Sequence, residues 1–190
     1  MTPLALTISN RYSPRVSSWL RDIVLIVIGS LLLAVLAQVS FSLPFTPIPL
    51  TGQTFGVLLL GAALGSKRGI TSMLIYILEG GMGLPFFAGG ASGWHVLVGA
   101  TAGYLFGFVV AAYVIGLLAE RGLERAVRTS FLPFLIGTLI IYLFGVTWLA
   151  ILLGSFSKAI LVGLLPFLIG DVIKLVLAAL ALPAAWKLVN

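Results

Sequence analysis

Residues 159–186 read AILVGLLPFLIGDVIKLVLAALALPAAW, a stretch that is apolar apart from one acid, Asp171, and one base, Lys174. A charged side chain near the centre of a bilayer costs roughly 2.5–3.5 kcal/mol, so charges at this depth are usually retained for function. Residues three positions apart lie on the same face of a helix. The stretch therefore predicts a transmembrane helix that turns a polar face towards the inside of a helix bundle.

The chain as a whole has the composition of an integral membrane protein. It is 61% hydrophobic and 8% charged, with a mean hydropathy of +1.21. Charges are absent from residues 23–66, 80–119 and 129–157. Each of these runs can hold one or more spans, since a helix needs about 20 residues to cross the hydrocarbon core. We predict an all-α integral membrane protein, with residues 1–190 forming a single six-helix membrane domain and residues 1–18 a cytoplasmic N-terminal segment.

Prolines, glycines and charged residues interrupt the apolar runs and so indicate the limits of the six transmembrane helices. The expected helices are residues 19–41, 53–64, 70–79, 94–119, 131–153 and 166–187. Between them we expect a proline-rich loop (42–51), a tight basic turn (65–69), a glycine-rich loop (80–93), a charged loop (120–128) and a connection (154–165).

The distribution of basic residues predicts the orientation. With the N-terminus inside, Lys158 alone falls outside and Lys174 lies within a span. The cytoplasmic side then holds Arg11, Arg15, Arg21, Lys67, Arg68, Arg121, Arg125, Arg128 and Lys187. This positive-inside asymmetry predicts cytoplasmic N- and C-termini. It also accounts for the net charge of +6 without a nucleic-acid partner.

In this orientation the polar groups gather in the outer half of the bundle. Asp171 and Glu79 fall at a similar outer level, beneath the loops 42–51 and 80–93. Irregular backbone at membrane depth is tolerated where it is buried in protein or lines a cavity. We therefore predict an outward-facing pocket for a small molecule.

Several kinds of chemistry are missing from the sequence. There is no cysteine, and the single histidine, His95, cannot build a His-based metal site alone. Residues 61–67 (GAALGSK) miss the spacing of a phosphate-binding loop, so the chain is not expected to hydrolyse ATP. No internal repeat suggests a self-sufficient secondary transporter. These features favour a substrate-binding membrane subunit that another protein powers, with no enzyme activity, cofactor or metal.

Three motifs resemble a known family when taken in order. They are YILEGGMGLPFFAGG (76–90), GATAGYLFGF (99–108) and LPFLIGDVIK (165–174), and PFTPIPLTGQTF (44–55) also fits. Together they resemble the BioY family, the biotin-specific substrate-capture components (S-components) of energy-coupling factor (ECF) transporters, over residues 30–182. One departure is Gly99-Ala100-Thr101, where the family usually has Gly-Pro-Thr.

The resemblance implies a protein of the prokaryotic cell membrane that binds biotin from outside. It also implies partners for ATP-driven uptake, namely a transmembrane scaffold protein and a pair of ABC-type ATPases, although some members take up biotin alone. The scaffold-contact face of the first helix is approximated here by Ser30, Ala34 and Ala37. Small residues at this spacing let helices approach closely.

Asp171 is the leading candidate for ligand binding. The ureido ring of biotin offers two N–H donors, and hydrogen bonds to a carboxylate are about twice as strong as neutral ones. The alternative is a structural ion pair between Asp171 and Lys174. Lys174 could balance Asp171, bind the ureido carbonyl or meet the valerate carboxylate, and the sequence leaves these three roles open.

The other candidates each have a structural alternative. Glu79 could shape the site or cap a helix end, and His95 is assigned with Trp94 to the membrane interface. The remaining substrate-binding candidates are aromatic wall residues, a loop glycine and two polar side chains: Phe86, Phe87, Tyr104, Gly89, Thr101 and Gln53. Two other functions stay open, an S-component for another vitamin and a lipid-modifying membrane enzyme. The enzyme would need a cluster of acids that the sequence does not provide.

Overall fold

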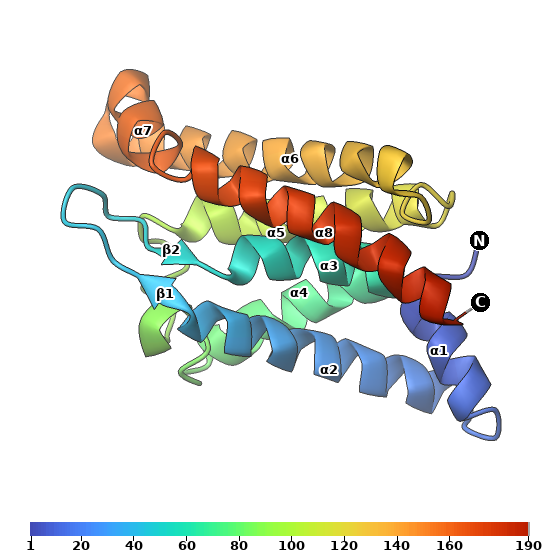
Figure 1. Cartoon of the computed structure of the whole chain (residues 1–190). Helices are drawn as coiled ribbons and strands as arrows, with labels where there is room; N and C mark the ends of the chain where they lie inside the picture. The colour runs from blue at the N-terminus through green and yellow to red at the C-terminus, as the bar shows by residue number, and fades with distance from the viewer. Residues whose placement is uncertain (190) are drawn as a thin grey trace.

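The computed structural model describes residues 1–189, which form a bundle of helices lying roughly side by side (Figure 1). A two-stranded antiparallel pair at one end joins β1 to β2, with Ser40 opposite Thr51 and Phe41 opposite Leu50. The elements in chain order are α1 (Leu4–Tyr12), α2 (Ser18–Gln38), β1 (Ser40–Phe41), β2 (Leu50–Thr51), α3 (Gln53–Leu64), α4 (Ser66–Gly81), η1 (Ala88–Gly90), α5 (Ala102–Ala119), α6 (Val127–Leu153), α7 (Phe156–Gly163) and α8 (Leu168–Val189).

The predicted class, a helical membrane protein, is confirmed by the length and composition of several helices. Among residues 1–189, four helices are long and apolar enough to cross a membrane: α2, α5, α6 and α8. Helix α3 is apolar but shorter. Large apolar side chains lie exposed along the outside of α2, which is the pattern expected of a surface that faces lipid rather than water. They include Val24, Ile28, Leu31, Leu32 and Val35.

Helix α5 is the centre of the bundle and packs against α3, α4 and α6. Glycines make this close packing possible. A Cβ on Gly103 would lie 2.4 Å from the Cβ of Trp148 in α6, and a Cβ on Gly116 would lie 2.3 Å from the backbone nitrogen of Ser66 in α4. Small residues at such positions let apolar helices approach until their backbones nearly touch.

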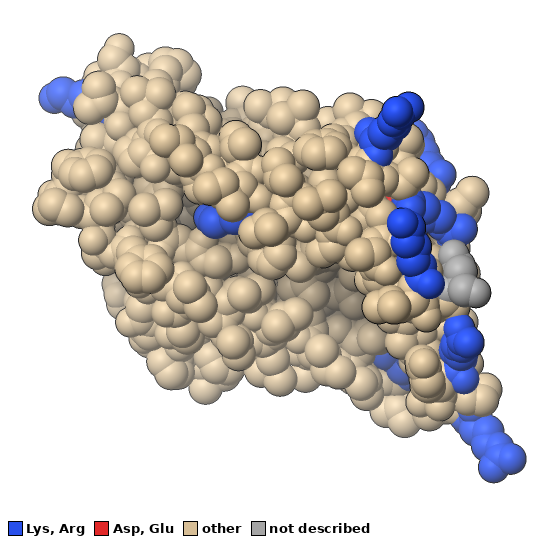
Figure 2. Space-filling model, viewed as in Figure 1, with Lys and Arg blue, Asp and Glu red and all other residues tan. Residues whose placement is uncertain are grey.

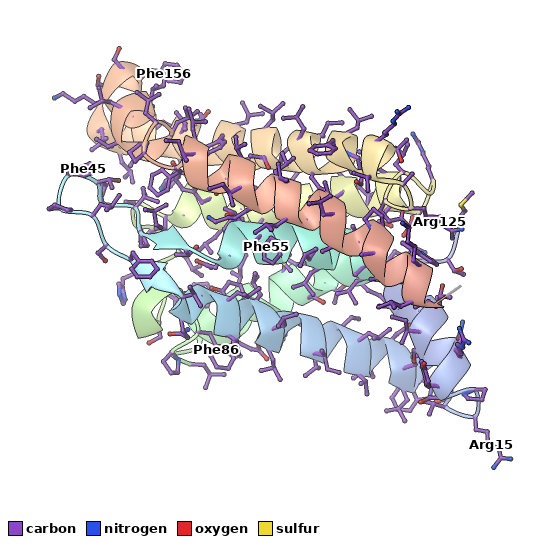
Figure 3. All side chains as sticks on the ribbon, viewed as in Figure 1. Arg15, Phe45, Phe55, Phe86, Arg125 and Phe156 are labelled. Carbon is purple, nitrogen blue, oxygen red and sulfur yellow. The ribbon has the colours of Figure 1, made fainter. Side chains whose placement is uncertain are left out.

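The two chain termini lie at the same end of the bundle (Figure 1). Most basic side chains visible on this face gather at that end, as Figure 2 shows. Figure 3 places Arg15 and Arg125 there, and Phe45 and Phe156 at the opposite end. The charge asymmetry predicted from the sequence is therefore present in the folded chain.

Acidic side chains hold the turns at the end that carries the termini. The carboxylate of Glu120 accepts hydrogen bonds from the backbone N–H and the hydroxyl of Ser66, both at 2.8 Å, and so caps α4. Glu124 is buried and accepts a hydrogen bond from the indole of Trp186 at 3.1 Å, while the guanidinium of Arg125 lies 4.3 Å from the ring centroid of Trp186. Burial raises the pKa of Glu124 above its ordinary value. These contacts tie the α5–α6 loop to α4 and to the end of α8.

The opposite end is held by contacts between segments far apart in sequence. The hydroxyl of Thr46, in the loop between β1 and β2, donates to the carbonyl of Val162 at 2.6 Å. The hydroxyl of Tyr104 donates to the carbonyl of Gly163 at 2.7 Å. The proline-rich loop and α7 are therefore fixed to each other and to the central helix.

Several predicted boundaries were wrong, for local reasons. The predicted basic turn 65–69 is confined to Gly65 (φ +81°), because the Glu120 cap lets α4 begin at Ser66. The predicted helix 94–119 begins at Ala102, since residues 93–101 form successive i→i+3 turns. Helix α6 begins at Val127, inside the predicted charged loop 120–128.

Several further elements were not foreseen. The predicted connection 154–165 contains α7, which begins after the N-cap residue Ser155. The N-terminal segment 1–18 holds α1, whose Leu4 is buried. The proline-rich loop 42–51 ends in β2, and its partner β1 takes up residues that the predicted helix 19–41 had included. These are short elements stabilised by tertiary contacts, which periodicity alone does not indicate.

The small residues assigned to scaffold contact face the inside of this chain. Ser30 and Ala37 have no exposed surface and Ala34 has 5%. Helix α2 packs on α3 and α4 along this side. A contact between this face and another protein, which stays a prediction, would require α2 to separate from its neighbours.

The close approach of α5 to the α3–α4 turn gives a test of the packing. We expect Gly116→Ala to lower stability by about 1–3 kcal/mol, the usual range for overpacking, because the obstructing atoms belong to the backbone. Gly170→Ala is the matched control, since the nearest atom to its Cβ would be 3.9 Å away. Thermal unfolding of both variants in detergent would be followed by tryptophan fluorescence. An equal melting temperature for the two variants would contradict the packing described here.

Candidate functional site

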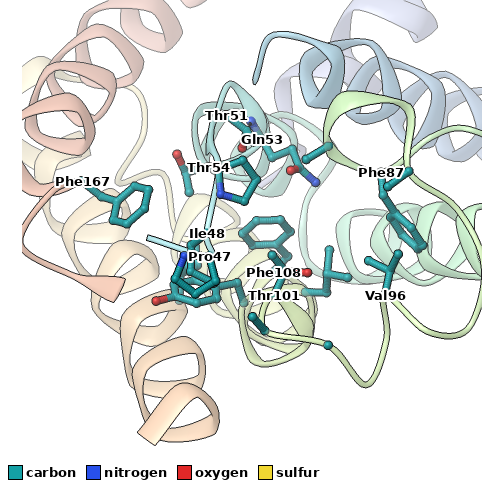
Figure 4. Close-up of a pocket in the computed structure, with 18 of the residues that line it drawn as sticks. Pro47, Ile48, Thr51, Gln53, Thr54, Phe87, Val96, Thr101, Phe108 and Phe167 are labelled. Atoms are coloured by element: carbon teal, nitrogen blue, oxygen red, sulfur yellow. Dashed lines mark hydrogen bonds between the residues drawn. The ribbon is translucent and has the colours of Figure 1, made fainter. Parts of the chain in front are cut away.

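A cavity of about 320 Å³ opens among α3, α5, α6 and α8 (Figure 4). It lies at the end of the bundle that carries the β1–β2 pair, whose place Figure 1 shows. This volume is at the lower end of the ~300–1,000 Å³ usual for small-molecule sites. Its lining is mostly apolar with a few polar side chains. The lining residues are Pro47, Ile48, Pro49, Thr51, Gln53, Thr54, Phe87, Ala88, Ala91, His95, Val96, Gly99, Ala100, Thr101, Tyr104, Leu105, Phe108, Ile141, Tyr142, Phe167, Asp171 and Lys174.

The buried carboxylate of Asp171 is the polar centre of the cavity. Its Oδ1 accepts hydrogen bonds from the hydroxyl of Thr54 at 3.1 Å and from Nζ of Lys174 at 2.9 Å. Its Oδ2 accepts one from the hydroxyl of Tyr142 at 2.5 Å. Nζ of Lys174 also donates to the Thr54 hydroxyl at 2.9 Å. Asp171 and Lys174 thus form an ion pair that side chains from α3 and α6 hold in place.

Counting partners among residues 1–189, this network leaves two hydrogen-bonding positions unused. A carboxylate offers about four acceptor positions and an ammonium group three donors. Asp171 uses three acceptor positions and Lys174 two donors. What remains is one acceptor position, on Oδ2 of Asp171, and one donor on Lys174. A ligand that carries a donor beside an acceptor can satisfy both.

Aromatic and aliphatic side chains form the walls of the cavity. Figure 4 shows Phe167 on one side, Phe87 and Val96 on the other, and Phe108 between them. The ring of Phe87 packs edge-on against Tyr76, with centroids 5.6 Å apart. A Cβ on Gly80 would lie 2.4 Å from the Phe87 ring, so this glycine makes room for the wall. An apolar ring system can be buried between these surfaces.

Hydrogen bonds fix the loop that carries Phe87. The amide nitrogen of Gln38 donates one hydrogen to the carbonyl of Ala34 at 3.0 Å and directs the other towards the backbone carbonyls of residues 85–87, which lie 3.3–3.4 Å away. Gln53 donates to the Tyr76 hydroxyl at 2.7 Å, and that hydroxyl donates to the carbonyl of Phe86 at 3.1 Å. These hydrogen bonds attach the glycine-rich loop to α2, α3 and α4 on one side of the cavity.

The cavity brings together six of the nine substrate-binding candidates. Asp171, Lys174, Phe87, Thr101, Tyr104 and Gln53 line it. Glu79, Phe86 and Gly89 lie outside the lining defined by residues 1–189. Phe86 contributes its carbonyl to the loop network, and Gly89 (φ +65°) shapes the turn next to the lining residue Ala88. Oε2 of Glu79 is buried and has no hydrogen-bond partner within the described residues.

Several lining residues are not among the candidates that the sequence indicates. Tyr142 and Thr54, the partners of Asp171, stand in apolar helices where a hydroxyl gives little signal by itself. Phe108 lies one helical turn beyond Tyr104, so the i, i+4 spacing could have indicated it. His95 was assigned to the membrane interface, whereas the structure places it in the cavity lining.

Comparison with known proteins identifies the family. A model described as the BioY family matches residues 8–190. The chain is 47% identical over 143 residues to the biotin transporter BioY of Thermotoga maritima, which covers 73% of this chain and 81% of that protein. It is 38% identical over 169 residues to the biotin transporter BioY of Rhizobium etli, covering 84% and 90%. The chain belongs to the BioY family, as its three ordered motifs predict.

A solved structure supports the fold. The S-component for biotin from an ECF-type ABC transporter, determined at 2.1 Å, matches with a TM-score of 0.81 over 90% of this chain and 95% of that one. The two sequences are 20% identical, so this likeness establishes the shared fold.

The ion pair in the cavity can be tested by a mutant cycle. Lys174→Met alone leaves the Asp171 carboxylate without its cation, so we expect a clear loss of stability. The double variant Asp171→Asn/Lys174→Met removes both charges and is expected to regain most of that loss. The coupling should fall below the ~3–5 kcal/mol of a fully buried pair, because the Lys174 side chain is 20% exposed. The coupling energy is obtained from melting temperatures measured in detergent. If the effects of the two substitutions on stability simply add, the two charges are not coupled.

Proposed function

We propose that this protein is the substrate-capture component of an ECF-type transporter, that it binds biotin from outside, and that partner subunits drive uptake with ATP. Membership of the BioY family and the biotin transporters among its relatives support this proposal. The protein itself catalyses no chemical transformation.

One observation carries the assignment of the ligand: the unused acceptor on Asp171 Oδ2 and the unused donor on Lys174 lie in one network. A ureido group presents an N–H donor next to a carbonyl acceptor. In the proposed complex the N–H donates to Asp171 and the carbonyl accepts from Lys174. Both bonds involve an ionised group and are therefore stronger than neutral hydrogen bonds. The oxygen of Gln53, which lines the same cavity and whose amide N–H₂ group already donates to Tyr76, is the proposed acceptor for the second ureido N–H.

The apolar walls complement the rest of biotin. Its sulfur-containing ring and aliphatic chain make no strong hydrogen bonds, and Phe87, Phe108 and Phe167 offer surfaces to bury them. The loops 42–51 and 80–93 form a cover over this part of the site. Loops of this kind can open to admit a ligand and then exclude water.

Another vitamin is the alternative ligand, since one fold can carry different sites. A vitamin without an adjacent donor and acceptor would leave the free position on Asp171 unpaired, which is costly in a buried site. A lipid-modifying enzyme is not favoured, because the acid in the cavity is neutralised by Lys174 at 2.9 Å.

The proposed arrangement in the membrane has six spans. Helices α3 and α4 supplement the four longer helices, the chain termini face the cytoplasm, and the cavity opens to the outside of a prokaryotic plasma membrane. The end-to-end charge asymmetry supports this orientation through the positive-inside rule. A transmembrane scaffold protein and a pair of ABC-type ATPases complete the transporter.

Equilibrium binding of radiolabelled biotin to the detergent-purified protein tests the ligand. We expect saturable binding by the wild type, with competition by unlabelled biotin but not by a panel of other water-soluble vitamins. Asp171→Asn should lower the affinity for biotin roughly 10-fold or more, since a hydrogen bond to a charged group contributes ~1.5–3 kcal/mol. Leu180→Ala, an exposed position further along α8, is the control. A folded wild type that binds another vitamin and not biotin would refute the assignment.

The absence of cysteine allows a clean test of orientation. Arg15→Cys places a single thiol at an exposed position near the end that carries the termini (Figure 3). Lys158→Cys places one at an exposed position in α7, at the opposite end (Figure 1). A membrane-impermeant maleimide applied to whole cells should label Lys158→Cys, and it should label Arg15→Cys only after the cells are permeabilised. The reverse pattern would show that the cavity opens to the cytoplasm.

A further inference from the structure

We propose that His95 recognises the carboxylate of the ligand at the mouth of the cavity and so selects for an acidic tail. This inference rests on the proposed function, in which the ureido end of biotin meets Asp171 and Lys174. The carboxylate at the other end of the molecule then needs a partner of its own.

The charges of the cavity argue for this partner. Lys174 and His95 are the two basic side chains in the lining formed by the described part of the chain. Nζ of Lys174 lies 2.9 Å from the carboxylate of Asp171, which neutralises it. A ligand carboxylate placed there would meet Asp171 at close range, and two like charges in a poorly solvated site repel each other. The acidic end of the ligand is therefore directed away from Lys174.

His95 has the exposure that a carboxylate partner requires. Asp171 is 6% exposed, whereas His95 belongs to the exposed part of the lining. A carboxylate that stays partly hydrated avoids most of the cost of burying a charge. An imidazole N–H can donate to a carboxylate whether the ring is neutral or charged. The mouth of the cavity thus suits the charged end of the ligand, and its interior suits the neutral ureido end.

The segment that carries His95 is held in place before any ligand arrives. The backbone N–H of Gly93 donates to the carbonyl of Gly80 at 2.7 Å. The carbonyl of Gly99 accepts from the indole of Trp148 at 2.9 Å. Gly93 has φ +92°, and a Cβ there would lie 3.2 Å from Nδ1 of His95, so the imidazole packs beside this glycine. Preorganisation of this kind reduces the ordering that binding requires.

Comparison of biotin with biotinamide, its neutral analogue, isolates the role of the carboxylate. Affinities of both ligands would be measured for the wild type, His95→Ala, His95→Gln and Trp94→Ala. Trp94 is the control because it is an exposed neighbour that does not belong to the lining formed by residues 1–189. We expect the wild type to prefer biotin by roughly 10-fold, the effect of one hydrogen bond to a charged group.

The inference predicts a loss that depends on the ligand. His95→Ala should lower the affinity for biotin roughly 10-fold and leave the affinity for biotinamide unchanged. His95→Gln should retain part of the preference for biotin through its amide N–H₂ group. Trp94→Ala should retain the whole preference for biotin. If His95→Ala weakens both ligands equally, or neither, the inference is refuted while the proposed function stands. If the wild type binds neither ligand, the proposed function itself fails.

Discussion

A carboxylate inside an apolar helix bundle must be paired and hydrogen-bonded, and the site is organised around meeting this requirement for Asp171. Its three donors come from three helices: Thr54 of α3, Tyr142 of α6 and Lys174 of α8. Thr54 and Tyr142 fix how α3 and α6 are turned towards α8, whereas Lys174 lies on the same helix as Asp171 and pairs with it at i, i+3. The hydrogen bonds to Asp171 are therefore a constraint on packing as much as a feature of the pocket, since α3 or α6 turned by one residue would withdraw its hydroxyl from the carboxylate.

The glycines of α5 supply the second constraint, because they determine how closely the helices approach. Gly103 and Gly107 allow α6 to pack against the backbone of α5, which brings Tyr142 within reach of Asp171. At the other end, Gly116 admits the α3–α4 turn and the Glu120 cap. Close packing at the centre and a polar network at one end are linked, because larger residues on α5 would separate the helices that supply the donors.

The sequence predicted those features that depend on local chemistry. Two charges in an apolar segment located the polar centre of the cavity, and runs without charge identified the membrane class. Features that depend on which helix faces meet were not predictable in this way. Ser30, Ala34 and Ala37 have the spacing of a contact face, but spacing does not reveal whether the partner is another protein or the same chain, and here they are buried against the chain itself. Helix α7 was missed for a similar reason, since tertiary contacts through Thr46 and Tyr104 hold it in place.

The burial of that α2 face has a consequence for how release could be coupled to partner subunits. The loop over the cavity is held by Gln38 at the end of α2, whose amide reaches the carbonyls of residues 85–87. Any movement of α2 away from α3 and α4 would expose the small residues and, at the same time, withdraw Gln38 from the loop. A partner that bound the exposed face would favour the state in which the loop is released. Contact with the partner and opening of the site would then be coupled through one helix.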